Sequence, residues 1–365
     1  MSPPPIVLSN HGLRRAGGIE AYLITLLHGL HQRGIRPTVV AKRVDHTMAE
    51  AAWADTVEPV MFGVPGKLRD RWFDWQLRRL KARHGWYPLI ALNQTAAADI
   101  AICGNNHPAH LAAMQQARLL RSDRWKIDLE RRHLHCSRVI VAHSRLLSEQ
   151  VQQHYGIAPA KIVVAYPPVD AERFAPVSAP ARAQLRQQLG LPDDRPVFLL
   201  VSTGHARKGL DIAIRAVARA SRPCLLVTVG RPPDVQAPNL RYLGYRSDIE
   251  DVYRAVDATL LPSRYEPFGL VGVESVLCGT PVLIERHAGC AEVLLPPAAL
   301  PFDLGDDHSL AAAIEAALER WQHDDLRIAQ PLAALAYDPS VQAHLDVLLA
   351  WVERLRAERD QADGG

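Results

Sequence analysis

Short apolar runs alternate with amphipathic helical patterns along most of this chain of 365 residues. Such an alternation is typical of a parallel β-sheet whose strands are joined by helices. It occurs twice, and the stiff sequence Tyr166-Pro167-Pro168 separates the two halves. The length also suits two domains, each large enough for a core of its own. The sequence therefore predicts an α/β protein with two Rossmann-like parallel-sheet domains, residues 1–167 and 168–338.

Strands and helices are expected in close succession in both domains. In the first domain they are the strands Ile6–Ser9, Thr38–Ala41, Val57–Phe62 and Ile162–Val164, further strands near Leu89, Ile100 and Val139, and the helices Gly18–Arg33, Lys67–His84 and Ser144–Tyr155. In the second they are the strands Val197–Ser202, Cys224–Val229, Leu240–Leu243 and Ala258–Leu261, the helices Gly209–Ala220, Asp248–Ala255 and Gly269–Cys278, and a last helix from about Val341 to Arg359. Ligands of open parallel sheets bind beyond the carboxyl ends of the strands, so functional residues are expected in the loops that follow them.

One such loop carries the most specific pattern in the chain. Residues Ser263–Glu274 read Ser-Arg-Tyr-Glu-Pro-Phe-Gly-Leu-Val-Gly-Val-Glu and hold two carboxylates, Glu266 and Glu274, on either side of Gly269. The predicted helix that starts at this glycine presents free backbone N–H groups in its first turn. Such groups attract phosphate, and neighbouring carboxylates accept hydrogen bonds from sugar hydroxyls. The pattern therefore suits a nucleotide sugar, and the alternative is that both glutamates are solvated charges flanking a helix.

This run resembles the donor-binding signature of family 4 glycosyltransferases, which are retaining enzymes of the GT-B fold. The sequences at Cys278–Leu283 and Gly289–Glu292 also fit that family. The resemblance implies two domains that face each other across a cleft, with a C-terminal helix, residues 339–365, returning to the first domain. It also implies that Glu274 binds the ribose and that Glu266 contacts the transferred sugar. Three residues of the same run, Phe268, Gly269 and Leu270, are expected in the donor site with them.

A cationic loop follows the first strand of the second domain. It reads Ala-Arg-Lys-Gly-Leu-Asp from Ala206 to Asp211, and Lys208 matches the lysine of the family. An ammonium at this point can reach a diphosphate and stabilise the charge that develops on the leaving group. Where the family often has an arginine, this chain has Ser202, so either Arg207 compensates or this branch uses one cation. Some lipopolysaccharide-core glucosyltransferases also lack that arginine and keep Arg-Lys-Gly. Recognition of the base is expected after Gly244, from Tyr245 and Arg246.

The first domain offers less specific patterns. Gly17 and Gly18 open the first helix, and the lack of Cβ atoms lets a phosphate or sugar approach the backbone. The resemblance places them against the donor diphosphate, whereas close packing of helix on strand is the alternative. It also implies a histidine or acidic residue near the transferred sugar, for which His107 is the expected match and Asn105 the reserve. The alternative for His107 is a cap of the following helix, and His11 is a further candidate.

Basic residues are concentrated in the first half of the chain. Residues 1–167 contain 22 Lys and Arg against 12 Asp and Glu, a net charge of +10, and the remainder contains 20 against 27, a net charge of −7. Two segments hold much of the excess, Lys67–Arg83 and Arg118–Arg138. Aromatic residues interleave with the cations of the first segment, as in helices that lie on anionic membranes. The alternative is that these aromatic residues pack into the domain. No recognition motif for nucleic acid accompanies the basic segments.

Several classes of site and protein are disfavoured. The five cysteines form no Cys-x-x-Cys pair, which indicates reduced thiols in a cytosolic protein and argues against structural zinc. Residues 1–10 do not resemble a secretory signal, and no run reaches the roughly 18 apolar residues of a membrane-spanning helix. The chain has no Asp-x-Asp pair, the motif that holds a divalent metal in the other large glycosyltransferase fold. We therefore expect neither a metal nor a cofactor besides the nucleotide sugar, with positive charge supplied by Lys208, Arg207 and backbone amides.

Together with these patterns, the resemblance to family 4 implies a retaining, metal-independent hexosyltransferase with Lys208, Glu266 and His107 as catalytic residues. The resemblance indicates that it transfers glucose from UDP-glucose to a lipopolysaccharide-core or surface-polysaccharide acceptor. It would then be a cytoplasmic protein, peripheral to the inner face of the cytoplasmic membrane. Two alternatives are a same-fold enzyme with a small soluble acceptor and a non-catalytic protein that binds sugar nucleotides. Only Ser202 favours the latter.

Overall fold

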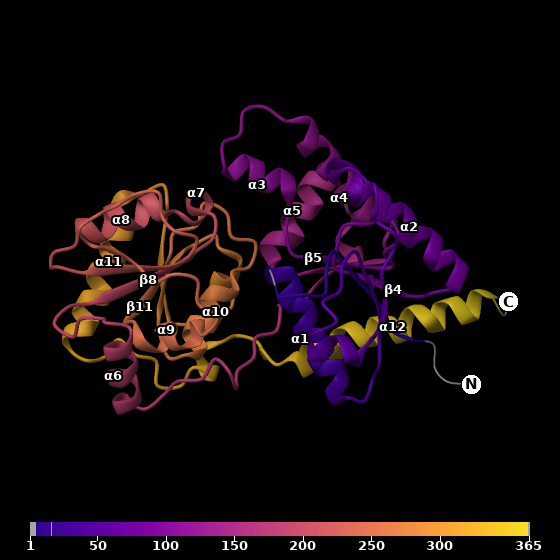
Figure 1. Ribbon diagram of the computed structural model, residues 1–365. Helices are drawn as coiled ribbons and strands as arrows, with labels where there is room; N and C mark the ends of the chain where they lie inside the picture. Colours follow the sequence, from indigo (N-terminus) through magenta and orange to yellow (C-terminus); the bar gives the residue numbers. More distant parts are fainter. Residues whose placement is uncertain (1–4, 16, 364–365) are drawn as a thin grey trace. The chain divides into compact units, whose positions relative to one another are not determined.

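The computed structural model describes residues 5–15 and 17–363, and the chain divides into two units (Figure 1). The first unit comprises Met1–Pro168 together with Pro339–Gly365, and the second comprises Val169–Asp338. The division lies directly after the Tyr166-Pro167-Pro168 sequence, one residue beyond the expected boundary. The first four residues of the segment considered for a secretory signal lie outside the described residues.

In the first unit, the described residues form a seven-stranded parallel sheet in the order β3-β2-β1-β4-β5-β6-β7. Alternate strand residues belong to two separate hydrophobic clusters, because successive side chains of a strand point to opposite faces of the sheet. Helices therefore cover both faces, as expected for a parallel sheet. The elements are β1 (Val7–Asn10), α1 (Gly18–Gln32), β2 (Thr38–Ala41), η1 (Ala49–Trp53), β3 (Asp55–Val57), η2 (Gly66–Leu68), α2 (Arg69–His84), β4 (Leu89–Ala91), β5 (Ile100–Cys103), α3 (His107–Ala113), α4 (Arg121–Cys136), β6 (Val139–Ala142), α5 (Arg145–Tyr155), η3 (Pro159–Lys161), β7 (Ile162–Val164) and α12 (Val341–Asp363).

The second unit repeats this plan with six parallel strands among its described residues, in the order β10-β9-β8-β11-β12-β13. The strand order reverses between β8 and β11 here, and between β1 and β4 in the first unit. The elements are α6 (Ala179–Gln188), β8 (Val197–Ser202), α7 (His205–Lys208), α8 (Leu210–Ala218), β9 (Leu225–Gly230), β10 (Leu240–Tyr242), α9 (Ile249–Ala255), β11 (Ala258–Leu261), α10 (Leu270–Leu277), β12 (Val282–Glu285), η4 (Gly289–Glu292), β13 (Ala299–Phe302), α11 (Asp307–Gln322) and η5 (Leu332–Ala334).

One expected strand is placed wrongly. The sequence predicts Val57–Phe62, whereas the edge strand β3 is Asp55–Val57 and pairs with Thr38–Val40 of β2. Pro59 has no N–H group to donate to a neighbouring strand. The side chain of Glu58 accepts a hydrogen bond from the backbone N–H of Val44 at 3.0 Å. The chain therefore leaves the sheet before Phe62. Most other expected elements are present with bounds that differ by at most three residues.

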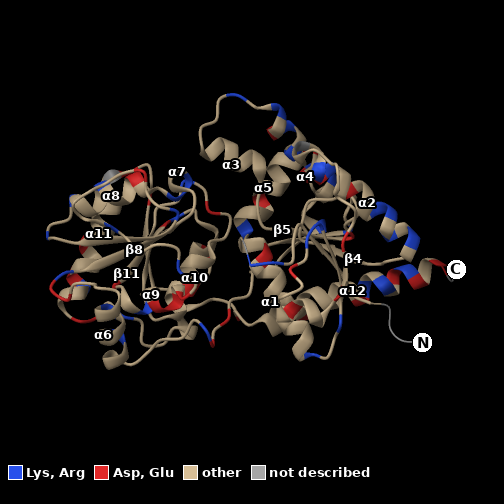
Figure 2. Ribbon diagram, in the orientation of Figure 1, with Lys and Arg blue, Asp and Glu red and all other residues tan. Residues whose placement is uncertain are grey.

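Charged residues are unevenly distributed over the first unit, as the sequence indicates. Lys and Arg residues recur along α2 and at the start of α4 (Figure 2). Among the described helices, none combines the length and the apolar character needed to cross a membrane. All five cysteines are free thiols, and of these only Cys136 is exposed.

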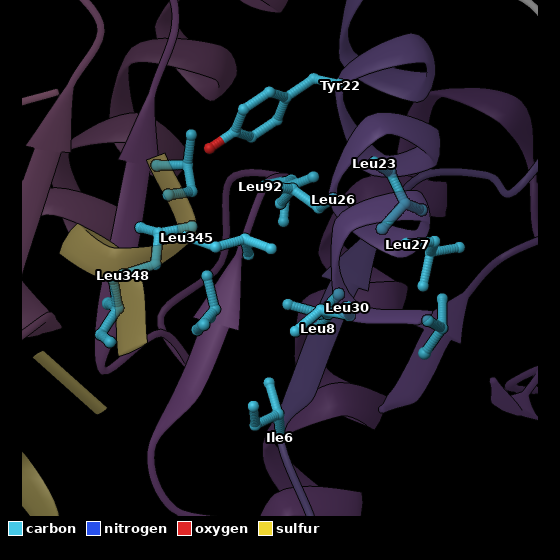
Figure 3. Packing of buried hydrophobic residues seen from close by; sticks show 14 of the residues in the cluster. Ile6, Leu8, Tyr22, Leu23, Leu26, Leu27, Leu30, Leu92, Leu345 and Leu348 are labelled. Atoms are coloured by element: carbon cyan, nitrogen blue, oxygen red, sulfur yellow. The ribbon is translucent and has the colours of Figure 1, made fainter. Parts of the chain in front are cut away.

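The C-terminal helix α12 packs against α1 in the first unit (Figure 3). Leu345 and Leu348 lie beside Leu26 and Leu30 in one buried cluster. Gly29 makes this approach possible, because a Cβ at that position would lie 2.6 Å from Cδ1 of Leu345. Any side chain at position 29 would therefore push α1 and α12 apart. The polypeptide therefore returns from the second unit to complete the core of the first.

A buried histidine fixes the start of α12. Nε2 of His344 lies 2.6 Å from the Tyr22 hydroxyl, and its Nδ1 lies 2.9 Å from the carbonyl oxygen of Tyr166, next to the boundary between the units. Burial lowers the pKa of His344 to about 4 and that of neighbouring His143 to about 3. Both imidazoles are therefore neutral at pH 7.

This burial predicts an acid-sensitive first unit. A histidine with a depressed pKa stabilises the folded state fully above its unfolded value near 6.5, and the contribution is lost as the pH falls toward the folded value near 4. From pH 7 to pH 5, His344 should account for a loss of about 2 kcal/mol in the free energy of unfolding. His344→Gln should remove this part of the pH dependence in denaturant titrations, and His323→Gln, on the surface of the second unit, is the control. An unchanged pH dependence in the His344 variant would disprove the assignment.

Candidate active site

The loops after β8 and β11 are adjacent at the carboxyl edge of the second sheet. The two strands are hydrogen-bonded neighbours, yet the chain proceeds from β8 toward one edge of the sheet and from β11 toward the other. Ligands of open α/β sheets bind at such a reversal of strand order. The cationic loop follows β8 and the two-carboxylate loop follows β11, so both sequence patterns lie at this point.

Lys208 and Glu266 are in direct contact there. The ammonium of Lys208 donates a hydrogen bond to Oε2 of Glu266 at 2.6 Å, and the hydroxyl of Ser263 donates to the same oxygen at 2.9 Å. Both charged side chains are 9% exposed. Burial alone would raise the pKa of Glu266, but the charges of Lys208 and Arg207 and these hydrogen bonds bring it below its usual value. The carboxylate is therefore held ionised.

A second cation adjoins this pair. Nη1 of Arg207 donates to the carbonyl oxygen of Tyr265 at 2.8 Å and lies 3.3 Å from Oε2 of Glu266. At the position of the family arginine, Ser202 is buried, and its hydroxyl lies 2.8 Å from Nδ1 of His205. The positive charge at this edge therefore comes from Arg207 and Lys208, which follow one another in the chain.

Two glycines with a left-handed backbone bring the loops together. Gly209 has φ of +72°, and a Cβ there would lie 2.1 Å from the carbonyl oxygen of Pro262. Gly269 has φ of +98°, and its Cβ would lie 2.8 Å from Cγ of Glu266. Residues other than glycine rarely adopt this conformation, and at both positions there is also no room for a Cβ atom. The close approach of Lys208 to the Glu266 loop thus depends on the absence of both Cβ atoms.

The 3₁₀-helix η4 supports the carboxylate loop from the other side. The backbone N–H of Gly289 donates to the carbonyl oxygen of Glu266 at 2.9 Å, and that of Cys290 donates to Phe268 at 2.6 Å. A Cβ at Gly289 would lie 2.0 Å from the carbonyl oxygen of Pro267. The sequence at Gly289–Glu292 therefore has a structural explanation, since it fixes the loop that carries Glu266.

Glu274 lies one turn into α10 and is half-buried. The hydroxyl of Tyr253, itself fully buried, donates to Oε2 of Glu274 at 2.9 Å. Burial raises the pKa of Glu274 above its usual value, against the effects of the Tyr253 hydrogen bond and of the positive charges of Arg173 and Lys208. The positive charge of Lys208 lowers the pKa of Glu274 as well as that of Glu266.

Tyr253 is predicted to position Glu274. Replacement by phenylalanine removes a hydrogen bond from a carboxylate that burial already disfavours, so Glu274 should lose part of its affinity for hydroxyl groups. We expect KM for the donor to rise about fivefold to tenfold, with kcat within about twofold. Steady-state kinetics at varied donor concentration measures both parameters. A fall in kcat at unchanged KM would show that Tyr253 does not act through donor binding by Glu274.

The remaining residues of the predicted donor site differ in exposure. Phe268 is buried, Leu270 is half-buried at the start of α10, and Tyr245 is 76% exposed in the loop after β10. Nε of Arg246 donates to Oδ1 of Asp248 at 2.8 Å. The exposed ring of Tyr245 can stack on a base, and its role stays a prediction.

In the first unit, Gly17 and Gly18 lie at the start of α1, as expected. Both are exposed, and a Cβ added at Gly18 would meet no described atom within 4 Å. Close packing of helix on strand therefore does not explain this glycine. His11, in the preceding loop, is largely buried, and burial with the charge of Lys42 lowers its pKa to about 4. It is a neutral imidazole at pH 7.

His107 is anchored to α4. Its Nε2 lies 3.2 Å from Oδ1 of Asp123, and its backbone N–H donates to Glu130 at 3.0 Å. The cap of α3 is Asn106, whose side chain accepts from the N–H of Ala109 at 3.0 Å, so the capping alternative for His107 is wrong. The carbonyl oxygen of Asn105 accepts from the thiol of Cys103. A part for His107 in the reaction stays a prediction.

The sequence analysis assigns no role to two residues that position the carboxylates, Ser263 and Tyr253. Ser263 stands within the recognised run, three residues before Glu266, and that spacing is a usable signal. Tyr253 is 21 residues before Glu274, and only the packing of α9 on α10 brings them together. Within the described residues, no group of three or more His, Cys, Asp and Glu side chains could hold a metal ion.

Known protein families and a known protein resemble this chain in sequence. Two family models match, Glycosyltransferase Family 4 over residues 16–173 and Glycosyl transferases group 1 over residues 181–329. A probable transglycosylase of Burkholderia thailandensis is 43% identical over 367 residues, which covers 99% of each chain. The chain belongs to glycosyltransferase family 4.

More distant relatives of this glycosyltransferase differ in their named reactions. The D-inositol 3-phosphate glycosyltransferase of Kineococcus radiotolerans is 28% identical over 339 residues, 79% of this chain and 77% of its own. Among solved structures, WaaG, a glycosyltransferase involved in lipopolysaccharide biosynthesis, has a TM-score of 0.73 at 16% identity and covers 97% of this chain and 95% of WaaG. Anabaena HepE in complex with UDP and glucose has a TM-score of 0.72 at 19% identity and covers 95% of this chain and 100% of HepE. Together with the two parallel sheets, these likenesses establish the GT-B fold.

Proposed function

We propose that this glycosyltransferase is a retaining, metal-independent hexosyltransferase that uses UDP-glucose. The observation that carries the proposal is the contact of Lys208 with Glu266 at the strand reversal, with Glu274 on the helix that directly follows the Glu266 loop. The combination offers cations for a diphosphate and carboxylates for sugar hydroxyls. UDP and glucose bound to HepE, a structural neighbour, support the choice of donor.

The chemistry of each charged group at this site suggests its role in binding the donor. An ammonium has three N–H donors, and within the described residues Lys208 gives one to a carboxylate, that of Glu266. The other two can serve the phosphates of the donor, and Arg207 adds a second cation. Glu266 accepts hydrogen bonds from the transferred sugar, and Glu274 accepts them from the ribose. Roles of His107, Gly17 and Gly18, which lie in the first unit, stay predictions from the family resemblance.

The proposed reaction exchanges one bond to the anomeric carbon for another. The bond to the diphosphate oxygen breaks, and the acceptor hydroxyl oxygen bonds to the same face of the sugar, so the configuration is kept. The acceptor proton passes to the departing phosphate. The protein positions both substrates and stabilises the charge on the leaving group, and these two effects carry most of the catalysis.

For the acceptor, we propose a lipopolysaccharide-core or surface-polysaccharide glycan on the inner face of the cytoplasmic membrane. The net charge of +10 on residues 1–167 favours an anionic acceptor. The named process of WaaG agrees with this choice. A small soluble acceptor is the second candidate, because several relatives are named D-inositol 3-phosphate glycosyltransferases, one covering 98% of this chain at 26% identity.

Thermal-shift measurements with UDP-, GDP- and ADP-glucose test the donor. A ligand that binds only the folded state raises its stability by about 2.7 kcal/mol at 100 times Kd, so UDP-glucose should raise the unfolding temperature most. Proton NMR of the product then tests retention, which requires an α-linked glucose from the α-linked donor. Stabilisation by none of the three donors, or a β-linked product, would refute the proposal. Transfer of labelled glucose to core-truncated lipopolysaccharide or to inositol phosphate decides between the acceptors.

A further inference from the structure

Exposed large apolar side chains are concentrated on one part of the first unit. Of the thirteen exposed in the described part of the chain, eight lie in residues 60–75 or 119–125. Phe62 is the most exposed, at 96%. The eight are Val60, Phe62, Leu68, Trp72, Trp75, Leu119, Leu120 and Trp125. Single exposed apolar residues are ordinary, whereas such a concentration marks an interaction site. We name this set, with the arginines beside it, the α2–α4 surface.

Contacts between the segments make this surface continuous. The indole N–H of Trp72 donates to the carbonyl oxygen of Val60 at 2.9 Å, which holds the loop of Phe62 beside α2. The Arg71 guanidinium lies 5.8 Å from the ring centre of Trp125 and 3.8 Å from Oδ2 of Asp128, both on α4. The loop, α2 and the start of α4 therefore present their exposed side chains together.

The two tryptophans of α2 lie outside the hydrophobic core. Phe73 and Leu77 are buried against the sheet with at most 1% exposure, whereas Trp72 and Trp75 are 39% and 42% exposed. The two tryptophan rings stack on each other with centres 4.9 Å apart. The alternative drawn from the sequence, that the aromatic residues of this segment pack into the domain, therefore holds for Phe73 but not for the tryptophans.

Basic residues are frequent in the segments that carry these apolar side chains, in particular along α2 (Figure 2). The exposed basic residues are Arg69, Arg71, Arg78, Arg79, Arg118, Arg121, Arg124 and Lys126. Nearby acidic side chains are largely engaged, because Asp70 pairs with Lys42, and Asp128 lies 2.8 Å from Arg132. Within the described residues, Arg118, Arg121 and Arg124 have no carboxylate within 4.0 Å. The surface therefore has an unneutralised positive charge.

We infer that the α2–α4 surface binds a bilayer of anionic phospholipids. Tryptophan and arginine suit the boundary between headgroups and acyl chains, because each joins an apolar body to a polar group. The arginines would pair with lipid phosphates, while Phe62, Leu119 and Leu120 enter the apolar layer. An acidic protein or a nucleic acid would explain the arginines but not the exposed Phe62. The inference deepens the proposed function, because it names the surface that brings the enzyme to a membrane-linked acceptor.

Flotation with lipid vesicles tests this inference on the full-length protein. Vesicles of phosphatidylcholine with phosphatidylglycerol should carry the protein upward, and vesicles of phosphatidylcholine alone should not. Phe62→Ser with Leu120→Ser should weaken the partition into anionic vesicles at least about tenfold. Arg121→Glu with Arg124→Glu should weaken it about 30-fold or more, since each basic residue contributes about fivefold.

Matched changes in the second unit serve as controls. Val235→Ser with Leu332→Ser alters two exposed apolar residues, and Arg195→Glu with Arg215→Glu alters two exposed arginines. Both should float like the wild type. All variants should keep the thermal shift with UDP-glucose, which separates a lost membrane contact from unfolding and from failure of the donor proposal.

Two results would overturn the inference. Wild-type flotation of both α2–α4 variants would show that this surface is not the binding site. Loss in the arginine variant alone, with the Phe62 and Leu120 variant unaffected, would indicate a polyanion partner such as an acidic protein or a nucleic acid in place of a bilayer.

Discussion

Replacing Lys208 with alanine is expected to lower kcat more than about 100-fold, because a single preorganised electrostatic donor to a leaving group is worth at least that much. Its ammonium lies 2.6 Å from Glu266 and is the better buried of the two cations at the carboxyl edge of β8. Arg207 stays behind in this variant, 3.3 Å from the same carboxylate oxygen. It is 30% exposed, so it replaces only part of the lost charge.

The pH profile of the Lys208 variant gives a second readout. The charges of Lys208 and Arg207 hold the pKa of Glu266 below its usual value against the effect of burial. Without the ammonium this pKa rises, so the low-pH limb of the kcat profile should move to higher pH. Arg215→Ala, which removes an exposed cation of the same unit, should leave kcat within about twofold. Near-normal turnover of Lys208→Ala, or an unmoved limb, would contradict the assignment.

The sequence predicts most of the central strands well because these are buried on both faces. The run Val197–Leu200 is apolar throughout, and Ala258–Leu261 is interrupted only by the buried Thr259, so the bounds of both strands are found with little error. The edge strand β3 lacks this signal, since Asp55 is exposed and its neighbours are half-buried. Val60 and Phe62, which follow β3, are more apolar but exposed. Because of their apolar character, the sequence places the expected strand too late, at Val57–Phe62.

The candidate site is predictable where its chemistry is local in the chain. Glu266, Gly269 and Glu274 share one run, and Lys208 is in a motif of its own. Tyr253 could not be found in this way, because its hydroxyl reaches Glu274 only through helix packing. The same holds for the partner of His107, because Asp123 lies on the next helix, 16 residues later. Tertiary contacts of this kind leave no periodic trace in a sequence.

Gly209→Ala is expected to reduce both stability and activity. The left-handed conformation, φ +72°, costs an alanine about 1–2 kcal/mol, and the added Cβ would lie 2.1 Å from the carbonyl oxygen of Pro262. Relief of that overlap costs about 1–3 kcal/mol more, for a total of about 2–5 kcal/mol in the free energy of unfolding. Because the N–H of Arg264 also donates to the carbonyl oxygen of Arg207 at 2.8 Å, the two loops cannot separate without loss. Any relief moves Lys208 away from Glu266.

Gly190→Ala separates the cost of the left-handed backbone from the cost of the overlap with Pro262. Gly190 lies in the same unit with φ +63°, but its Cβ would meet only Nη1 of Arg241, at an ordinary 3.8 Å. It should therefore lose about 1–2 kcal/mol in denaturant unfolding and keep its turnover. Gly209→Ala should lose more stability and, at temperatures where it is still folded, about tenfold or more in kcat, since small displacements of catalytic groups are costly. Equal losses of stability in the two variants, with full activity in both, would mean that the Gly209 contact with Pro262 does not hold Lys208 in place.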